Sequence, residues 1–184
     1  SHPERWGVVA ASPYAALVDY LDELEAAGVP SQRMIVAALG PRTLRLAAER
    51  TAGAHPFLVP VDHTRDARAV IGPDALLAVD QRVVLEGDAE RAPAIARPTV
   101  QTPYLGLSNY RRNLQRLGWN ETDLDDGGSD ALIDALVGHG DAEAVAARVR
   151  QQLEAGADHV CVQLLDSDEA GYARIATALG LTTG

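Results

Sequence analysis

The sequence contains no lysine, and all 16 of its basic residues are arginine. A Schiff base requires a lysine amine, so pyridoxal-phosphate enzymes and class I aldolases are excluded. The Walker A loop of nucleotide-binding ATPases also requires a lysine, so this class is excluded as well. Any bound phosphate must therefore be held by arginine, by hydroxyl groups or by backbone N–H groups.

Cysteine is almost absent too, because Cys161 is the only one in the chain. A single cysteine cannot form an internal disulfide or a cysteine-rich zinc site, and a reducing, cytoplasmic location is the simplest interpretation. The histidines and carboxylates show no metal-binding spacing such as HExxH, so we expect no metal. No GxSxG motif is present, which argues against an α/β-hydrolase.

Aromatic residues make up 4% of the chain although 47% of it is hydrophobic, so the core must consist mainly of Ala, Val, Leu and Ile. No apolar run approaches the ~20 residues of a membrane span. The formal net charge of −10 argues against nucleic acids and anionic membranes as partners, since both attract basic surfaces. A small-molecule substrate is the expected partner. The length of 184 residues suits one domain, which we expect over residues 1–184.

Two patterns alternate along the chain. Short continuous apolar runs predict strands buried on both faces, at residues 34–39, 54–59, 75–85 and 159–165. Amphipathic segments predict helices, at residues 13–27, 42–51, 62–72, 88–100, 141–155 and 168–179. Residues 104–140 are less regular and contain short helical pieces. This alternation predicts an α/β protein with a parallel sheet covered by helices, either doubly wound or a barrel.

Several segments carry a more specific pattern. Residues 37–50 (AALGPRTLRLAAER) place a Gly-Pro turn between an apolar run and a helix, and GAHPF at 53–57 is followed by PVDHT at 60–64. Further along the chain stand NYRRNL at 109–114, DALIDAL at 130–136 and AGADHV at 155–160. Together these segments resemble strands five to eight of the luciferase-like superfamily, in particular its F420-dependent oxidoreductases.

This resemblance implies a TIM (β/α)₈ barrel. Such a barrel has eight strands in typically ~250 residues, whereas four strands are predicted here. We therefore expect the chain to be the C-terminal part of a luciferase-like barrel that lacks its N-terminal strands. Barrels of this superfamily often dimerise, so the resemblance also implies a homo-oligomer, most simply a dimer.

The activity that the resemblance implies is hydride transfer between the deazaflavin coenzyme F420 and a small organic substrate. An FMN-dependent luciferase-like monooxygenase is an alternative, because both cofactors present a phosphate to a similar site. A second alternative is a non-catalytic barrel fragment that acts as an interaction module, since half a barrel leaves an open sheet edge.

The first candidate site is the turn between residues 34–39 and the helix that follows. The first turn of a helix has unpaired N–H groups and a partial positive charge, which suit a phosphate. The resemblance implies that Leu39, Gly40 and Pro41 contact the phosphate side of the cofactor, together with Arg42 and Thr43. The alternative interpretation is an ordinary turn with proline at the first helical position.

The second candidate site follows residues 54–59. Val59, Pro60 and His63 are cofactor-binding candidates by position, and His63 either contacts the phosphate or caps the following helix. His2 is the candidate catalytic residue, because some family members place an acid just after strand four and a histidine can exchange a proton near neutral pH. The alternative is that His2 is a terminal residue without a catalytic role.

Overall fold

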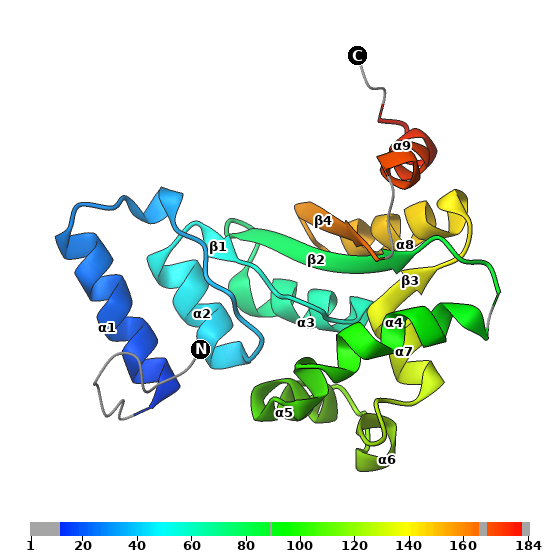
Figure 1. The fold of residues 1–184 in the computed structure, drawn as a ribbon. Coiled ribbons are helices and arrows are strands. Elements are labelled where there is room, and N and C mark those ends of the chain that lie inside the picture. Colours follow the sequence, from blue (N-terminus) through cyan, green and yellow to red (C-terminus); the bar gives the residue numbers. More distant parts are fainter. Residues whose placement is uncertain (1–11, 89, 166–168, 182–184) are drawn as a thin grey trace.

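The computed structural model describes residues 12–88, 90–165 and 169–181, in which a parallel sheet is packed against helices (Figure 1). The strands are β1 (Gly53–Ala54), β2 (Leu76–Val84), β3 (Val137–His139) and β4 (His159–Leu164). The helices are α1 (Pro13–Ala26), α2 (Pro41–Arg50), α3 (Val61–Ile71), α4 (Arg91–Gln101), α5 (Ser108–Arg116), α6 (Glu121–Leu124), α7 (Asp130–Leu136), α8 (Ala142–Glu154) and α9 (Glu169–Ala178), with short 3₁₀ turns η2 (Ser31–Arg33) and η3 (Tyr104–Gly106). The predicted α/β class and its parallel sheet are confirmed.

β2 is the central strand, and every pairing that it makes is parallel. Its residues Arg82 and Val83 are in register with β3 and also with β4, so these two strands lie on opposite edges of β2. β1 pairs with Leu76 and Leu77 at the beginning of β2. Within the described residues β4 pairs with β2 alone, so its outer edge has no neighbouring strand there.

Two of the predicted strands are much shorter than expected. Only Val36 of residues 34–39 forms a bridge, to Ala54, and the strand expected at 54–59 is reduced to β1. Proline has no N–H to donate to a ladder; Pro56 interrupts the second run, and Pro60 directly follows it. Leu58 between them has a φ of +49°, which is outside the extended region. The expected strand at 75–85 is observed as β2, one residue shorter at each end, and β3 was not predicted.

The helix boundaries follow local sequence signals. The Ser12 side chain accepts a hydrogen bond from the Ala15 amide at 3.1 Å, and Pro13 occupies the first turn of α1. Gly40 precedes α2 with Pro41 in its first turn, as predicted. Asp141 caps α8 by accepting from the Ala144 amide at 2.9 Å. None of the helices formed by the described residues is long and apolar enough to cross a membrane.

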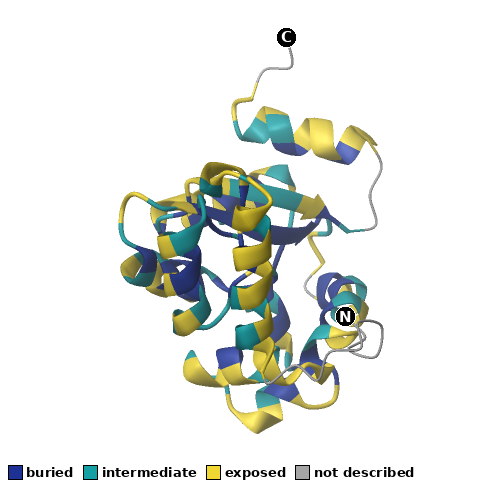
Figure 2. Ribbon diagram, turned by 90° about the vertical axis from the view of Figure 1, so that its left-hand side faces the viewer, coloured by how far each residue is buried: buried dark blue, intermediate teal, exposed yellow. Residues whose placement is uncertain are grey.

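The two faces of β2 differ in character. The odd-numbered residues Leu77, Val79 and Val83 are fully buried, and their clusters include residues of α2, α3, α8 and α9. The even-numbered residues Asp80 and Arg82 place a buried carboxyl and a buried guanidinium on the opposite face. Figure 2 shows the buried residues gathered at the centre, with exposed residues over the outer surfaces of the helices. One face of β2 thus carries two buried ionisable groups, whereas the buried polar side chain on the other face, Gln81, is a neutral amide.

Candidate functional site

The polar side chains of interest lie toward the carboxyl ends of the parallel strands. Arg82 is in the second half of β2, Gln163 is near the end of β4, and Gly40 and Pro60 precede α2 and α3. In open and closed parallel sheets alike, binding sites form where the strands end and the helices begin. This edge of the sheet is therefore the first place to look for a site.

The beginning of α2 has free hydrogen-bond donors. Gly40, its N-cap residue, has no side chain to cap the helix, and the amides of Arg42 and Thr43 have no acceptor among the described residues. The guanidinium carbon of Arg42 lies 3.6 Å from the ring centroid of Tyr14 in α1, which orients this exposed cation. The open backbone N–H groups of Arg42 and Thr43 at this helix end suit an anion.

The candidates after β1 are buried rather than exposed. Val59 and Pro60 are buried, and His63 is fully buried within α3. Its Nε2 lies 2.9 Å from the carbonyl oxygen of Leu39, which also accepts from Nη2 of Arg116 at 3.2 Å. The structure thus joins two of the predicted site residues, Leu39 and His63, through a direct hydrogen bond.

The environment of His63 favours the neutral imidazole. Burial lowers its pKa, since charging the ring would remove an ion from water. With Nε2–H donating to the Leu39 carbonyl, Nδ1 of the neutral ring carries the lone pair, and this atom has no hydrogen-bond partner among the residues that the structure describes. His63 therefore supports the turn before α2 from beneath. His2, the candidate catalytic residue, lies outside the described residues.

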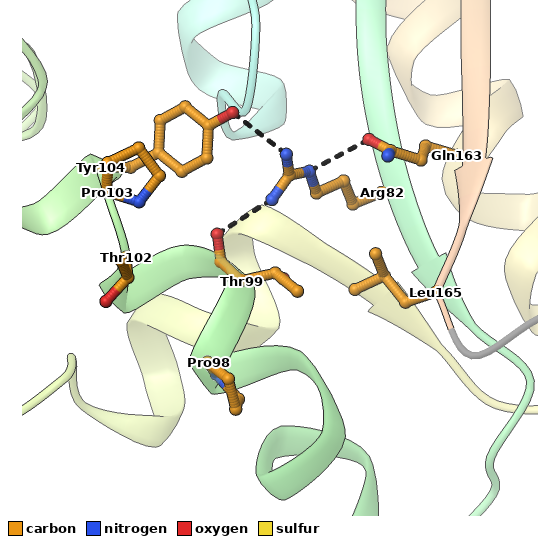
Figure 3. Close-up of a pocket in the computed structure, with 8 residues that line it drawn as sticks. All are labelled: Arg82, Pro98, Thr99, Thr102, Pro103, Tyr104, Gln163 and Leu165. Atoms are coloured by element: carbon orange, nitrogen blue, oxygen red, sulfur yellow. Dashed lines mark hydrogen bonds between the residues drawn. The ribbon is translucent and has the colours of Figure 1, made fainter.

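Sequence reasoning missed the polar pair on β2. The exposed fractions of Asp80 and Arg82 are 5% and 7%. Three neutral oxygens accept hydrogen bonds from the Arg82 guanidinium (Figure 3): Gln163 Oε1 from Nε at 3.2 Å, the Thr99 carbonyl from Nη1 at 2.9 Å and the Tyr104 hydroxyl from Nη2 at 3.1 Å. These contacts join β2, β4 and the end of α4 around one cation.

Asp80 connects the same face to the segment after β1. Its Oδ2 accepts a hydrogen bond from the amide of Leu58 at 3.4 Å, where the backbone is in the left-handed region. A non-glycine residue in this region is strained, and such residues concentrate at functional sites. Burial raises the pKa of Asp80, and the nearby Arg82 opposes this shift in part. Burial also raises the pKa of Cys161, the residue in register with Asp80, and the Asp80 carboxylate raises it further.

Aromatic rings flank the cation on one side. The guanidinium carbon of Arg82 lies 5.1 Å from the ring centroid of Phe57 and 4.9 Å from that of Tyr104. Tyr104 in turn packs edge to face against Tyr110, with ring centroids 4.9 Å apart. Burial raises the pKa of Tyr110 to about 12. The rings of Phe57 and Tyr104 thus help to hold the Arg82 guanidinium in place.

A cavity of about 340 Å³ opens beside this cluster. Its lining combines one charged group with neutral polar and apolar groups: Arg82, Pro98, Thr99, Thr102, Pro103, Tyr104, Gln163 and Leu165 (Figure 3). Small-molecule sites have this composition, with an apolar wall and a few polar groups that fix orientation. Among the described residues, no three His, Cys, Asp or Glu side chains gather as a metal ion would require.

The segment from Phe57 to His63 links the two parts of the site. Phe57 packs against Arg82, Leu58 is hydrogen-bonded to Asp80, and His63 bonds to Leu39 before α2. The sequence did contain a signal for the missed half. In the strand run ALLAVDQRVV, three polar residues interrupt an apolar pattern, and two of them necessarily share one face.

No protein-family model matches the sequence, and a search of curated proteins found no match either. Solved structures do match in fold. An F420-dependent secondary alcohol dehydrogenase in complex with an F420–acetone adduct superposes with a TM-score of 0.52 at 12% identity, over 79% of this chain and 48% of that one. The coenzyme F420-dependent tetrahydromethanopterin reductase from Methanopyrus kandleri gives 0.59 at 17% identity, over 84% and 50%.

The structure of apo-MsnO8 gives a TM-score of 0.56 at 14% identity, over 95% of this chain and 66% of that one. All three are luciferase-like proteins, so the resemblance indicated by the sequence is confirmed at the level of the fold. The chain spans about half the length of the two F420-dependent enzymes. At these identities the likeness concerns the fold alone.

Proposed function

We propose that the chain belongs to an F420-dependent oxidoreductase that transfers hydride between a deazaflavin cofactor and a small organic substrate. The observation that supports this proposal is the fold shared with two F420-dependent enzymes, one of them holding an F420–acetone adduct. The carboxyl edge of the sheet, where such folds bind ligands, carries the polar groups described above. In this proposal the sheet corresponds to strands five to eight of a (β/α)₈ barrel.

The residues at this edge fit an anionic, ring-bearing cofactor. The amides of Arg42 and Thr43 and the Arg42 guanidinium would hold its phosphate, with Gly40 and Pro41 allowing close approach of the backbone. His63 would keep Leu39 and the turn in position, and the buried Val59 and Pro60 would support the turn from below.

The bound cofactor would supply the hydride or accept it. The chain's own part at the reacting end would be to position and to shield. Phe57 and Tyr104 offer ring faces and exclude water beside the cavity, and Arg82 supplies a fixed positive charge. Further strands would be needed to enclose the substrate. We propose a cytoplasmic homodimer as the form that works in the cell.

The direct test is a titration of the full-length protein with F420 and with FMN, followed by fluorescence quenching. We expect F420 to bind more tightly. Arg42→Gln should weaken F420 binding about tenfold or more, because it removes a charged hydrogen-bond donor to phosphate. Arg45→Gln is the matched control, since Arg45 is exposed on the same helix and its side chain forms no hydrogen bond or ion pair with the described residues. This control should bind F420 like the unmodified protein.

Each other outcome points to a different function. Tighter binding of FMN would move the assignment to a flavin-dependent monooxygenase. Binding of neither cofactor by a folded protein would refute the oxidoreductase proposal. It would leave a barrel fragment that serves as an interaction module.

A further inference from the structure

Arg82 is the only buried arginine among the described residues, and most of the half-buried arginines have a carboxylate partner that Arg82 lacks; half-buried Arg148, which donates to the carbonyls of Asp134 and Ala135, is the exception. Arg68, Arg97 and Arg111 each contact at least one carboxylate: Asp158, Asp130, and Glu121 with Asp125, respectively. No carboxylate of the described residues lies within ion-pair distance of Arg82, although its exposed fraction is only 7%. Burying a charge is costly unless a counter-charge compensates it. Asp80 on the same face is near enough to interact with Arg82 electrostatically, but all the hydrogen bonds of the guanidinium go to neutral oxygens.

The guanidinium also has donors to spare. It carries five N–H groups, of which three are used by Gln163, Thr99 and Tyr104. Two N–H groups of Arg82 remain, and the guanidinium lines the cavity of about 340 Å³. A buried cation with unused donors in the wall of a cavity is the arrangement expected of an anion-binding group.

We propose that this cavity binds the carboxylate of a small organic acid, with Arg82 as the residue that receives it. The two remaining N–H groups, one on Nη1 and one on Nη2, equal in number the two oxygens of one carboxylate. The rest of the lining suits an organic body, because Pro98, Pro103 and Leu165 are apolar and the Tyr104 ring is flat. The volume lies in the range of small-molecule sites.

If the chain belongs to the proposed oxidoreductase, the bound acid is its substrate. Only this identification of the acid as substrate rests on the proposed function. Inorganic phosphate is a poorer match, because it needs more donors than Arg82 has left and gains nothing from apolar walls. The binding of the acid itself depends on the cavity alone, so it is measured without any cofactor.

The test uses the full-length protein labelled with ¹⁵N-arginine and follows the arginine Nε–H signals by NMR. The probes are propionate, benzoate and hydrocinnamate, each compared with its own amide, and inorganic phosphate. We expect a saturable shift of the Arg82 signal with at least one acid and none with the amide of that acid. Arg82→Gln should weaken binding of this acid about tenfold or more by calorimetry. Arg174→Gln, which changes an exposed arginine on α9, should leave binding unchanged.

Three results would overturn the inference: no saturable shift with any acid, equal binding of acid and amide, or a shift with phosphate alone. The comparison of acid and amide on the unmodified protein decides the question even where Arg82→Gln does not fold. Failure of the F420 titration with acid binding retained would refute the cofactor proposal and leave the carboxylate site standing. Binding of F420 without binding of any acid would refute the carboxylate site and leave the cofactor proposal standing.

Discussion

Gln152 Nε2 donates to Gln81 Oε1 at 2.9 Å, and both side chains are fully buried between β2 and α8. Gln152 Oε1 accepts from the Thr64 hydroxyl of α3 at 2.5 Å, and Gln81 Nε2 donates to the carbonyls of Arg82 and Leu136 at 2.8 and 3.2 Å. The network joins the helix face of β2 to two helices, while the opposite face of the same strand carries Arg82. It thereby fixes the strand on which the proposed carboxylate site depends.

Replacing Gln152 by leucine should lower the free energy of unfolding by about 2–4 kcal/mol, because it leaves Gln81 Oε1 and the Thr64 hydroxyl buried without partners. Urea denaturation followed by circular dichroism measures this loss. Gln151→Leu is the matched control, since Gln151 is the exposed neighbour on α8, and it should change stability by less than about 0.5 kcal/mol. Equal effects of the two substitutions would show that the network contributes nothing.

The pairing of β1 with β2 depends on the absence of a side chain at Gly53. A Cβ at this position would lie 1.9 Å from the backbone carbonyl oxygen of Leu76, and the backbone of a central strand cannot move away cheaply. Gly53→Ala should therefore cost about 3 kcal/mol or more in unfolding free energy, or prevent folding. Gly87→Ala is the control, because a Cβ there meets no atom within 4 Å. A Gly53→Ala protein as stable as this control would contradict the observed register.

His63 should make the protein less stable in mild acid. Its pKa in the folded state is lowered by burial from the ordinary value of 6.5, so the unfolded chain binds the proton more readily. The contribution of the neutral His63 to the unfolding free energy is fully present above pH 6.5, and it is lost as the pH falls from 6.5 toward the folded-state pKa. His63→Gln keeps an Nε2–H donor for Leu39 and removes the titration, so its unfolding free energy should vary less between pH 7 and 5. His159→Gln changes an exposed histidine and is the control, which should keep the pH dependence of the unmodified protein. If the unfolding free energy of His63→Gln also varied with pH as in the unmodified protein, the prediction would be wrong.

The sequence predicted the helices well because their signals are local. Ser12 with Pro13, Gly40 with Pro41, and Asp141 each mark a helix start by their own chemistry. The strands were harder. β3 is three residues long in a glycine-rich segment, and only its pairing with β2 makes it a strand. The run 54–59 looks apolar enough for a strand, but Pro56 and the tertiary hydrogen bond between the Leu58 amide and Asp80 take it out of the ladder.

The candidate site was predictable only in part, for a similar reason. The turn before α2 was found from Gly40 and Pro41, because a helix N-terminus is visible in the sequence. The direction in which a histidine ring points cannot be read from the sequence, so only the structure shows that His63 is buried. The cluster around Arg82 depends on Gln163, which lies 81 residues further along the chain and reaches Arg82 only through the pairing of β2 with β4.

Ionisation of the buried Asp80 carboxyl should lower the unfolding free energy at neutral pH. Burial raises its pKa in the folded state, so the folded protein holds the proton more tightly than the unfolded chain. The contribution of Asp80 to the unfolding free energy is therefore greatest below the ordinary pKa of 3.8, and it falls as the pH rises through the folded-state pKa. Asp80→Asn removes this ionisation and keeps an oxygen for the Leu58 amide. Its unfolding free energy should therefore exceed that of the unmodified protein at pH 7, with the difference shrinking toward pH 4.

The same substitution tests why a costly carboxylate is retained beside the cavity. Asp80→Asn removes a negative charge near Arg82, so organic acids should bind this variant more tightly than the unmodified protein at pH 7. Asp74→Asn, which changes an exposed carboxylate, should alter neither stability nor binding. An Asp80→Asn protein that is less stable by the same amount at every pH would show that the bond to Leu58 outweighs the desolvation of the carboxylate. The strained backbone at Leu58 would then be the feature that Asp80 serves, because a carboxyl oxygen would hold the Leu58 amide better than an amide oxygen whether or not Asp80 is ionised.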